Sequence, residues 1–262
     1  MSGLPSLEGR AAVITGGGRG VGAAVARQLA SAGASILVCA RTEAEVERVA
    51  SDLRDEGFAA HAATCDVADP SSVDCLARTA RDTLGSIDIL VNNAGISLGA
   101  PIHQTTYEDW MRVMAVNATG AFLCLKAFLP GMIDRGWGRV VNVASIAGIS
   151  GDRFISAYAA SKHALVGLTR AAAAEVAARG VTVNAVCPGY LRTDMTRDNL
   201  ARMAEATGRP EPDVLERLVQ RTPQKRLIEA DEVAAAVLFL CTEGARSITG
   251  ESIVIDGGEL RR

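Results

Sequence analysis

The feature that most constrains the fold of this chain is the regular alternation of short apolar runs with segments of helical pattern. The apolar runs are nearly continuous in Val, Ile, Leu and Ala, which is typical of strands in a sheet covered on both faces. A strand, a helix and a second strand in succession pair in parallel through a right-handed crossover. The sequence therefore predicts an α/β fold with one seven-stranded parallel sheet flanked by helices on both faces. The predicted strands cover residues 10–15, 35–40, 59–64, 87–92, 139–144, 181–187 and 252–256.

Helical patterns fill the connections between these strands, and no linker divides the chain, so we expect a single domain over residues 1–262. The connection at residues 190–226 differs because it is polar and contains Pro210, Pro212 and Pro223. Ligands of such sheets bind beyond the carboxyl ends of the strands, so we expect this segment to form a substrate lid; a surface connection without a role is the alternative. The predicted helices cover residues 20–32, 43–56, two stretches within 106–135, 157–178, 231–241 and a segment that begins after Asp69-Pro70.

Composition argues against several classes of function. The chain has 262 residues with 27 Lys or Arg and 30 Asp or Glu, and a formal charge of −3 argues against a general nucleic-acid binder. Three His, and six Cys without a Cys-x-x-Cys pair, give little support to a metal site. No apolar run reaches the roughly 18 residues of a membrane span, and Glu8 and Arg10 precede any apolar run, so we expect neither a membrane segment nor a signal peptide. Cysteines in apolar surroundings favour reduced thiols and a cytoplasmic location.

A glycine-rich turn from Thr15 to Gly22 joins the first predicted strand to the first predicted helix. Glycines at such a turn let backbone N–H groups approach a pyrophosphate, and the helix N-terminus adds a favourable partial charge. A turn without a ligand is the alternative, but the position of this one in a βαβ series favours a Rossmann-type dinucleotide site. The candidate cofactor contacts in this turn are Gly16, Gly18, Arg19, Gly20, Val21 and Gly22.

The end of the second predicted strand bears on which dinucleotide binds. Many dinucleotide folds place an acidic residue there to bind the ribose 2′-hydroxyl, but this strand ends in Ala40 and is followed by Arg41. A guanidinium at this position matches a 2′-phosphate, and Arg19 of the glycine turn is placed to assist. The sequence thus favours NADP(H) over NAD(H), with ordinary exposed arginines as the alternative.

Tyr158 and Lys162 stand four residues apart at the start of the long Ala-rich helix, so they share one helix face. A free Tyr has a pKa near 10, and we expect the Lys ammonium to lower it so that the phenol can act as an acid or base. Ser145 follows the fifth predicted strand at the end where ligands bind and is placed to bond a carbonyl or alcohol oxygen. A surface Tyr–Lys pair is the alternative if these two residues are taken alone.

With these motifs in view, the chain closely resembles the short-chain dehydrogenase/reductase family from about residue 8 to residue 258. The family's motifs occur in order at the glycine turn, Asp66, Asn92-Asn93-Ala94-Gly95, Asn117, Ser145, Tyr158 with Lys162, and Pro188-Gly189 with Thr193. The resemblance implies hydride transfer between a nicotinamide and a carbonyl or secondary alcohol. In that reaction Tyr158 would exchange the proton, with Ser145 and Lys162 in support.

The resemblance also implies roles for residues outside the Tyr–Lys pair. Asn117 would hold a water in a proton relay with Lys162, and would be catalytic in this sense. Asp66 and Val67 would contact the adenine, and residues 93–95 would wall the adenosine. The remaining implied contacts frame the nicotinamide. The cofactor residues that the resemblance adds are Asp66, Val67, Asn93, Ala94, Gly95, Tyr158, Lys162, Pro188, Gly189, Leu191 and Thr193.

Several stretches are similar to 3-oxoacyl thioester and polyketide ketoreductases, which implies a carbonyl substrate on an acyl carrier protein or CoA. Arg179 matches one of two basic residues that dock the carrier near the active-site mouth, but the other position falls on Gly136 beside Arg135. Residues 96–101 also depart from the polyketide enzymes. An alcohol dehydrogenase for a hydroxyacyl-CoA, polyol or sterol, and a catalytically inactive dinucleotide sensor, are the alternatives. Family resemblance further implies a homotetramer built through the helices near 106–135 and 157–178.

Overall fold

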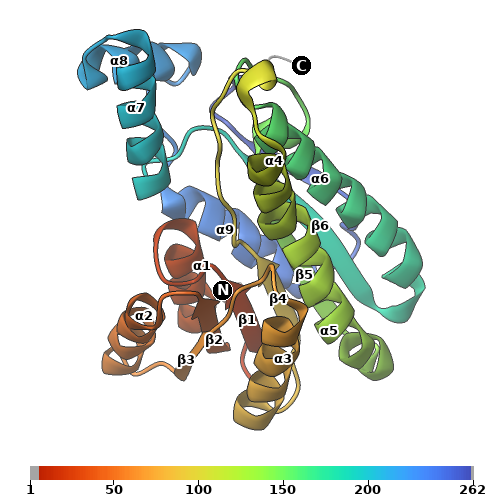
Figure 1. Cartoon of the computed structure of the whole chain (residues 1–262). Helices are drawn as coiled ribbons and strands as arrows, with labels where there is room; N and C mark the ends of the chain where they lie inside the picture. Colours follow the sequence, from red (N-terminus) through yellow and green to blue (C-terminus); the bar gives the residue numbers. More distant parts are fainter. Residues whose placement is uncertain (1–5, 261–262) are drawn as a thin grey trace.

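The computed structural model describes residues 6–260, so both ends of the predicted domain lie outside the described residues. Its centre is one parallel sheet of seven strands in the order β3-β2-β1-β4-β5-β6-β7 (Figure 1). The predicted fold class is confirmed, and the strand order reverses between β1 and β4, where sheets of this kind bind ligands. The strands are β1 Ala11–Thr15, β2 Ser35–Ala40, β3 Ala60–Thr64, β4 Ile89–Asn92, β5 Gly138–Val143, β6 Val181–Pro188 and β7 Ser252–Ile255.

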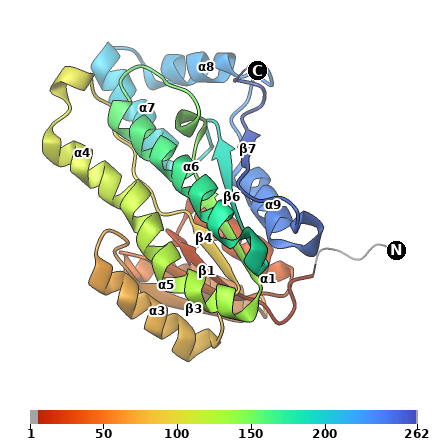
Figure 2. The ribbon, with the colours of Figure 1, turned by 90° about the vertical axis from the view of Figure 1, so that its right-hand side faces the viewer.

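The two faces of the sheet carry separate hydrophobic cores. In β1, Ile14 packs with one core and Val13 with the other, because successive side chains of a strand point to opposite faces. Helices α1, α2 and α9 cover the first face, and α3, α5 and α6 cover the second (Figures 1 and 2). These helices span α1 Gly20–Ser31, α2 Glu43–Asp55, α3 Pro70–Leu84, α5 Gly120–Arg135, α6 Ser156–Val176 and α9 Ala230–Cys241.

Helix α4, Tyr107–Met114, continues into α5 through one π-helical segment, Ala115–Thr119. Within the described residues, the resulting stretch 107–135 is long and apolar enough to cross a membrane, with a mean hydropathy of 1.5 in its best 18-residue window. The expectation that no segment has this character was therefore wrong. Cys124 and Phe128 pack against the sheet, but only 39% of that window is buried, so one side of the helix stays exposed and apolar.

Residues 190–226 are mainly helical, which the sequence analysis did not predict. They form α7, Asp194–Thr207, and α8, Glu211–Arg221, beyond the ends of the strands (Figure 1). Pro210 and Pro212 stand at the start of α8. The first N–H groups of a helix have no partner within it, so a proline there costs no hydrogen bond. The segment has a small core of its own, formed by Leu200, Val214, Leu218 and Leu227.

Candidate active site

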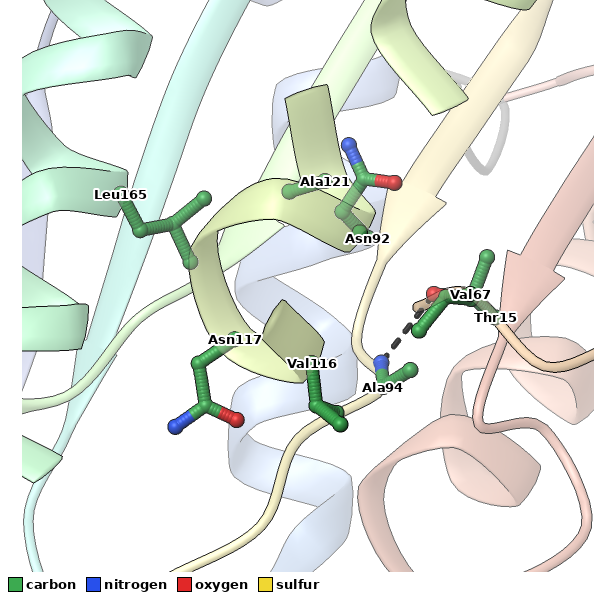
Figure 3. Close-up of a pocket in the computed structure, with 9 residues that line it drawn as sticks. Thr15, Val67, Asn92, Ala94, Val116, Asn117, Ala121 and Leu165 are labelled. Carbon is green, nitrogen blue, oxygen red and sulfur yellow. Dashed lines mark hydrogen bonds between the residues drawn. The ribbon is translucent and has the colours of Figure 1, made fainter. Parts of the chain in front are cut away.

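The glycine turn lies at the carboxyl edge of the sheet, meaning the edge where the strands end. Gly16 has φ +64°, and a Cβ on it would lie 2.9 Å from the Cα of Ala94. A Cβ on Gly22 would collide with the carbonyl of Gly16. The Thr15 hydroxyl accepts hydrogen bonds from the N–H groups of Asn93 (3.0 Å) and Ala94 (3.1 Å), the second of which Figure 3 shows. The turn thus packs so closely on the β4 end that side chains have no room at these glycines.

The start of α1 is open to an anionic ligand. Arg19 is its N-cap residue, but among the described residues no side chain caps the helix and no acidic residue stands in its first turn. Unbonded N–H groups at a helix start form an anion site, so this end of α1 fits the pyrophosphate of a dinucleotide. A Cβ on Gly20 would lie 3.7 Å from the Cγ2 of Thr193, so the segment after β6 contacts the start of α1. The structure thus brings the first and last of the predicted cofactor contacts together.

Charged side chains surround the outer side of the glycine turn. Arg41 directly follows β2, as predicted, and its side chain is exposed, while Arg19 lies 3.8 Å from Glu45. Arg48 donates a hydrogen bond of 3.2 Å to the carbonyl of Gly18. The sequence analysis missed Glu45 and Arg48, although one turn of α2 places both next to the turn. Two guanidiniums, Arg19 and Arg48, and one carboxylate, Glu45, therefore lie beside the glycine turn.

Ser145, Tyr158 and Lys162 meet at the carboxyl edge, on the side of β5 that faces α6. Ser145 follows β5 and accepts a hydrogen bond of 3.1 Å from the N–H of Ala147, which fixes its side chain. Tyr158 and Lys162 lie in the first two turns of α6, and the Lys162 Nζ is 5.8 Å from the centre of the Tyr158 ring. Lys162 is only 4% exposed and donates a hydrogen bond of 2.8 Å to the carbonyl of Val143.

Burial controls the protonation of both groups. It lowers the pKa of Lys162 to about 8, because a charged ammonium loses its hydration there. It raises the pKa of Tyr158, and the hydrogen bond with Ser145 only partly offsets this effect. We expected Lys162 to lower the pKa of Tyr158, and in this structure the pKa is raised instead. Tyr158 is thus a neutral phenol at pH 7, which suits a proton donor.

Asn117 lies on the π-helical segment, and its side-chain amide joins two other parts of the chain. The amide N–H₂ donates to the Ile96 carbonyl and to the Ser161 hydroxyl, both at 2.9 Å, and its oxygen accepts from the Ile96 N–H at 2.8 Å. A Cβ on Gly95 would lie 3.3 Å from this oxygen and 3.5 Å from the Lys162 Nζ. Asn117 and Lys162 thus flank the same glycine. Both N–H groups of the Asn117 amide already donate hydrogen bonds within the protein. The relay of protons through a water held by Asn117 stays a prediction.

A buried chain of polar side chains holds α6 against the sheet. The Asn92 amide donates to the Asn142 oxygen at 2.9 Å, and the Asn142 amide donates to the Thr169 hydroxyl at 2.8 Å. The sequence analysis missed this positioning role for Asn142 and Thr169. Asparagines inside apolar strands were the available signal, because a buried amide needs partners.

The other predicted cofactor residues also lie along the carboxyl edge. Asp66 follows β3, and its carboxylate accepts a hydrogen bond of 3.0 Å from the N–H of Ala68. Val67 packs closely against Gly120 of α5, because a Cβ added to Gly120 would lie 2.8 Å from the Cγ2 of Val67. Pro188 ends β6 and Gly189 follows it, while Leu191 forms a parallel bridge with Ile228.

Arg179 is one predicted residue that lies elsewhere. It ends a short helical turn directly before β6, at the opposite, amino edge of the sheet. Gly136 is beside it, because a Cβ on Gly180 would collide with the Gly136 carbonyl. At about 3.3 Å per residue, the eight residues of β6 separate this place from the catalytic edge by roughly 25 Å. Arg179 therefore lies far from the active site of its own chain, and its role in carrier docking stays a prediction.

Comparison with known proteins agrees with this arrangement. The model of the short chain dehydrogenase family matches residues 10–204. An acetoacetyl-CoA reductase from Rhizobium meliloti is 41% identical over 251 residues, covering 95% of this chain and 98% of that protein. A D-beta-hydroxybutyrate dehydrogenase from the same organism is 37% identical over 254 residues, covering 95% and 98%. The crystal structure of an actinorhodin polyketide ketoreductase with NADPH is 34% identical, with a TM-score of 0.94 over 97% of this chain and 98% of that one. The chain is therefore an oxidoreductase that belongs to the short-chain dehydrogenase/reductase family.

Proposed function

We propose that this protein is an NADP(H)-dependent ketoreductase that acts on a 3-oxoacyl or polyketide-like substrate. The observation that carries the proposal is the meeting of Ser145, Tyr158 and Lys162 at the carboxyl edge of the sheet, next to a glycine turn that fits a dinucleotide. A catalytically inactive sensor has no need of a buried lysine below such a phenol, because burying an ammonium costs free energy.

The residues divide the proton chemistry among them. A bound nicotinamide supplies the hydride in reduction and accepts it in oxidation. Tyr158, held neutral by its raised pKa, donates its proton to the carbonyl oxygen of the substrate. Ser145 donates a hydrogen bond to the same oxygen while negative charge develops on it. Lys162, protonated at pH 7 because its pKa is about 8, stabilises the phenolate that remains.

Arg41 directly after β2 and Arg19 in the glycine turn support a preference for NADP(H), since a guanidinium binds a phosphate well. Glu45 opposes this preference, because its carboxylate repels the same phosphate. We expect Arg41→Ala to reduce kcat/KM for NADPH by about tenfold or more and to leave the value for NADH nearly unchanged. Glu45→Gln should shift the ratio toward NADPH. Equal losses with both cofactors in Arg41→Ala would contradict the assignment.

The substrate class is supported by the relatives that act on acetoacetyl-CoA and on polyketides. The relative named for D-beta-hydroxybutyrate favours the second candidate, a dehydrogenase that oxidises a hydroxy acid or another secondary alcohol. A panel of β-keto thioesters on CoA and on carrier protein, quinones and cyclic ketones, followed by loss of NADPH absorbance, separates the two. Turnover of hydroxy acids with NAD⁺ and none of β-keto thioesters with NADPH would favour the dehydrogenase.

We also propose that α7 and α8 act as a lid over the substrate. Arg221 of α8 forms an ion pair with Asp152, in the loop before α6, and Ser97 donates a hydrogen bond of 2.9 Å to Asn199 of α7. Both contacts join the segment to loops at the carboxyl edge. Substrate with cofactor should slow tryptic cleavage after Arg197 and Arg202 of α7, and unchanged cleavage would contradict the lid.

A homotetramer in the cytoplasm completes the proposal. The α4–α5 stretch leaves Tyr107, Trp110, Met111 and Phe122 exposed on the helix that the family resemblance assigns to subunit contacts. The six cysteines form no disulfide, which suits a reducing compartment. Light scattering should give four times the mass of one chain, and a monomer would contradict the tetramer.

A further inference from the structure

Glu259, near the end of the described residues, carries a buried carboxylate that the proposed mechanism does not use. Its side chain is only 6% exposed, and the Nε of Arg221 on α8 forms an ion pair of 2.9 Å with its Oε1. Apart from this ion pair, neither carboxylate oxygen has a hydrogen-bond partner within residues 6–260. A buried charge is costly without a partner, so an ionised Glu259 depends on Arg221.

The pKa of Glu259 reflects this dependence. Burial raises the pKa of the carboxyl, because the charged form loses its hydration, and the charges of Asp256 and Asp152 raise it further. Arg221 acts in the opposite direction and lowers the pKa. The charge of Arg221 is therefore what favours the ionised form of Glu259.

A turn after β7 brings Glu259 to this place. The carboxylate of Asp256 accepts hydrogen bonds of 2.8 and 2.7 Å from the N–H groups of the second and fourth residues after it, which fixes the backbone on both sides of Glu259. Gly257 has φ +62°, and a Cβ on it would lie 2.6 Å from the Cγ2 of Thr222, directly after α8. The turn is thus packed tightly against the end of α8.

The same turn also packs against Pro188-Gly189, the segment that the family resemblance assigns to the nicotinamide. The N–H of Gly189 donates a hydrogen bond of 2.9 Å to the carbonyl of Ile255. A Cβ on Gly189 would lie 3.2 Å from the Cα of Asp256 and 3.7 Å from the Oε2 of Glu259. The carboxylate of Glu259 therefore lies between the nicotinamide segment and the proposed lid.

Arg221 extends this connection to the loop before the helix that carries Tyr158. Its Nη1 donates a hydrogen bond of 2.6 Å to Asp152 in that loop, while its Nε faces Glu259. The side chain of Asp152 is 33% exposed, so water screens its charge more than it screens the charge of Glu259. The loss of the Glu259 charge should therefore affect Arg221 more than the loss of the Asp152 charge.

We propose that Glu259 is a positioning residue, which holds the α7–α8 lid against the Pro188-Gly189 segment through Arg221. This inference rests on the proposed role of α7 and α8 as a lid. Without the Glu259 charge, Arg221 keeps only a partly exposed partner, and because its own side chain is 46% exposed, water replaces the lost carboxylate. The end of the lid then separates from Pro188-Gly189 more often. A lid that is closed for a smaller fraction of the time weakens substrate binding in proportion.

Hydrogen exchange in the protein without ligands tests the contact and needs no substrate. Glu259→Gln keeps the shape of the side chain and removes its charge. Amide exchange in peptides of α7 and α8, followed by mass spectrometry, should become about tenfold faster than in the parent, while peptides of β1, β4 and β5 stay unchanged. Glu251→Gln, which removes an exposed carboxylate directly before β7, should leave the lid unchanged. Equal exchange in Glu259→Gln and the parent would overturn the proposal.

A second substitution separates the effect of charge from that of packing. Arg221→Gln leaves the carboxylate of Glu259 buried without its cation and should lower the Tm by about 3 °C or more. Adding Glu259→Gln removes this unpaired charge, so the double variant should regain at least about half of the loss. A double variant no more stable than Arg221→Gln would show that the two residues are not coupled, and would overturn the proposal.

Steady-state kinetics with acetoacetyl-CoA and NADPH test the effect on the reaction. Glu259→Gln should raise KM for the thioester about fivefold or more, because the closed lid is populated less, and should keep kcat within about twofold of the parent. An unchanged KM with faster exchange in the lid would overturn the positioning role. If the parent does not turn over acetoacetyl-CoA, the proposed substrate class fails, while exchange and Tm still decide whether Glu259 holds the lid.

Discussion

The two edges of the sheet each bury one cation, and they do so in different ways. Lys162 at the carboxyl edge is 4% exposed, and it donates a hydrogen bond to an uncharged group, the Val143 carbonyl. Arg139 at the amino edge is 2% exposed but has a carboxylate, Glu243, and the Trp137 ring beside it. The pKa of Lys162 falls to about 8. The guanidinium stays charged at any physiological pH because its unperturbed pKa is so high.

This difference separates a group suited to chemistry from a group suited to binding. An ammonium with a pKa near neutrality responds to a phenolate or a bound cofactor, and can change its charge during a cycle. A guanidinium offers fixed donors in one plane and a permanent charge. The same sheet thus buries a titratable ammonium at one edge and a permanently charged guanidinium at the other.

The largest effect that we predict is on catalysis at the carboxyl edge. Tyr158→Phe removes the proton donor and should lower kcat by roughly 10²–10⁴. The matched control is Tyr107→Phe, since Tyr107 is 71% exposed on α4. Steady-state rates with a β-keto thioester and NADPH measure both. Near-normal turnover in Tyr158→Phe would remove Tyr158 from the reaction.

The next effect concerns how the buried Lys162 changes the stability of the folded protein with pH. Between pH 8 and 10.5 the unfolded chain holds the Lys162 proton more often than the folded chain, so the free energy of unfolding should rise with pH across this window. Lys162→Met abolishes this contribution. The difference in the free energy of unfolding between parent and variant should therefore change by about 3 kcal/mol between pH 8 and pH 10.5. Urea denaturation at a series of pH values measures it. Lys126→Met, at an exposed lysine of α5, is the control, and equal slopes in all three proteins would contradict the depressed pKa of Lys162.

The smallest effect concerns the arginine at the amino edge. Glu243→Gln keeps an acceptor for the Trp137 indole but removes the countercharge of Arg139, and should cost about 1–2 kcal/mol of unfolding free energy. The exposure of Glu243 keeps this value below that of a fully buried pair. Glu47→Gln, which breaks a surface pair with Arg54, should cost at most about 0.5 kcal/mol. An equal cost in both variants would mean that the Arg139 charge needs no partner.

Most of the fold could be predicted from the sequence, because the strands are mostly apolar and alternate with segments of helical pattern. The exception is the α7–α8 segment, which the sequence analysis described as polar and proline-containing without predicting a helix in it. Pro210 and Pro212 in fact begin α8, and Val214 and Leu218 follow at helical spacing, with their burial supplied by Leu227 from outside the helix. Short amphipathic helices are stabilised by the partner they cover, which the local pattern does not name.

The candidate site was predictable to a similar extent. Tyr158 and Lys162 share a helix face by their spacing alone, whereas the contacts of Asn117 with Ile96 and Ser161 join three separate segments. The place of Arg179 at the amino edge could not be predicted, because its distance from Tyr158 depends on the direction of α6 and β6. The pKa of Tyr158 was expected to move in the wrong direction because burial, not the nearest charge, dominates it.

By itself, the sequence determined the elements, the glycine turn and the pairing of a phenol with an ammonium, since all of these depend on residues within a few positions of one another. Only the tertiary structure decided which groups lose water and which strand neighbours share a face. It buried Lys162 without a countercharge and set Arg139 beside Thr182. The physical reason is that charge and hydrogen bonding are governed by what surrounds a group in space, and those surroundings come from distant parts of the chain.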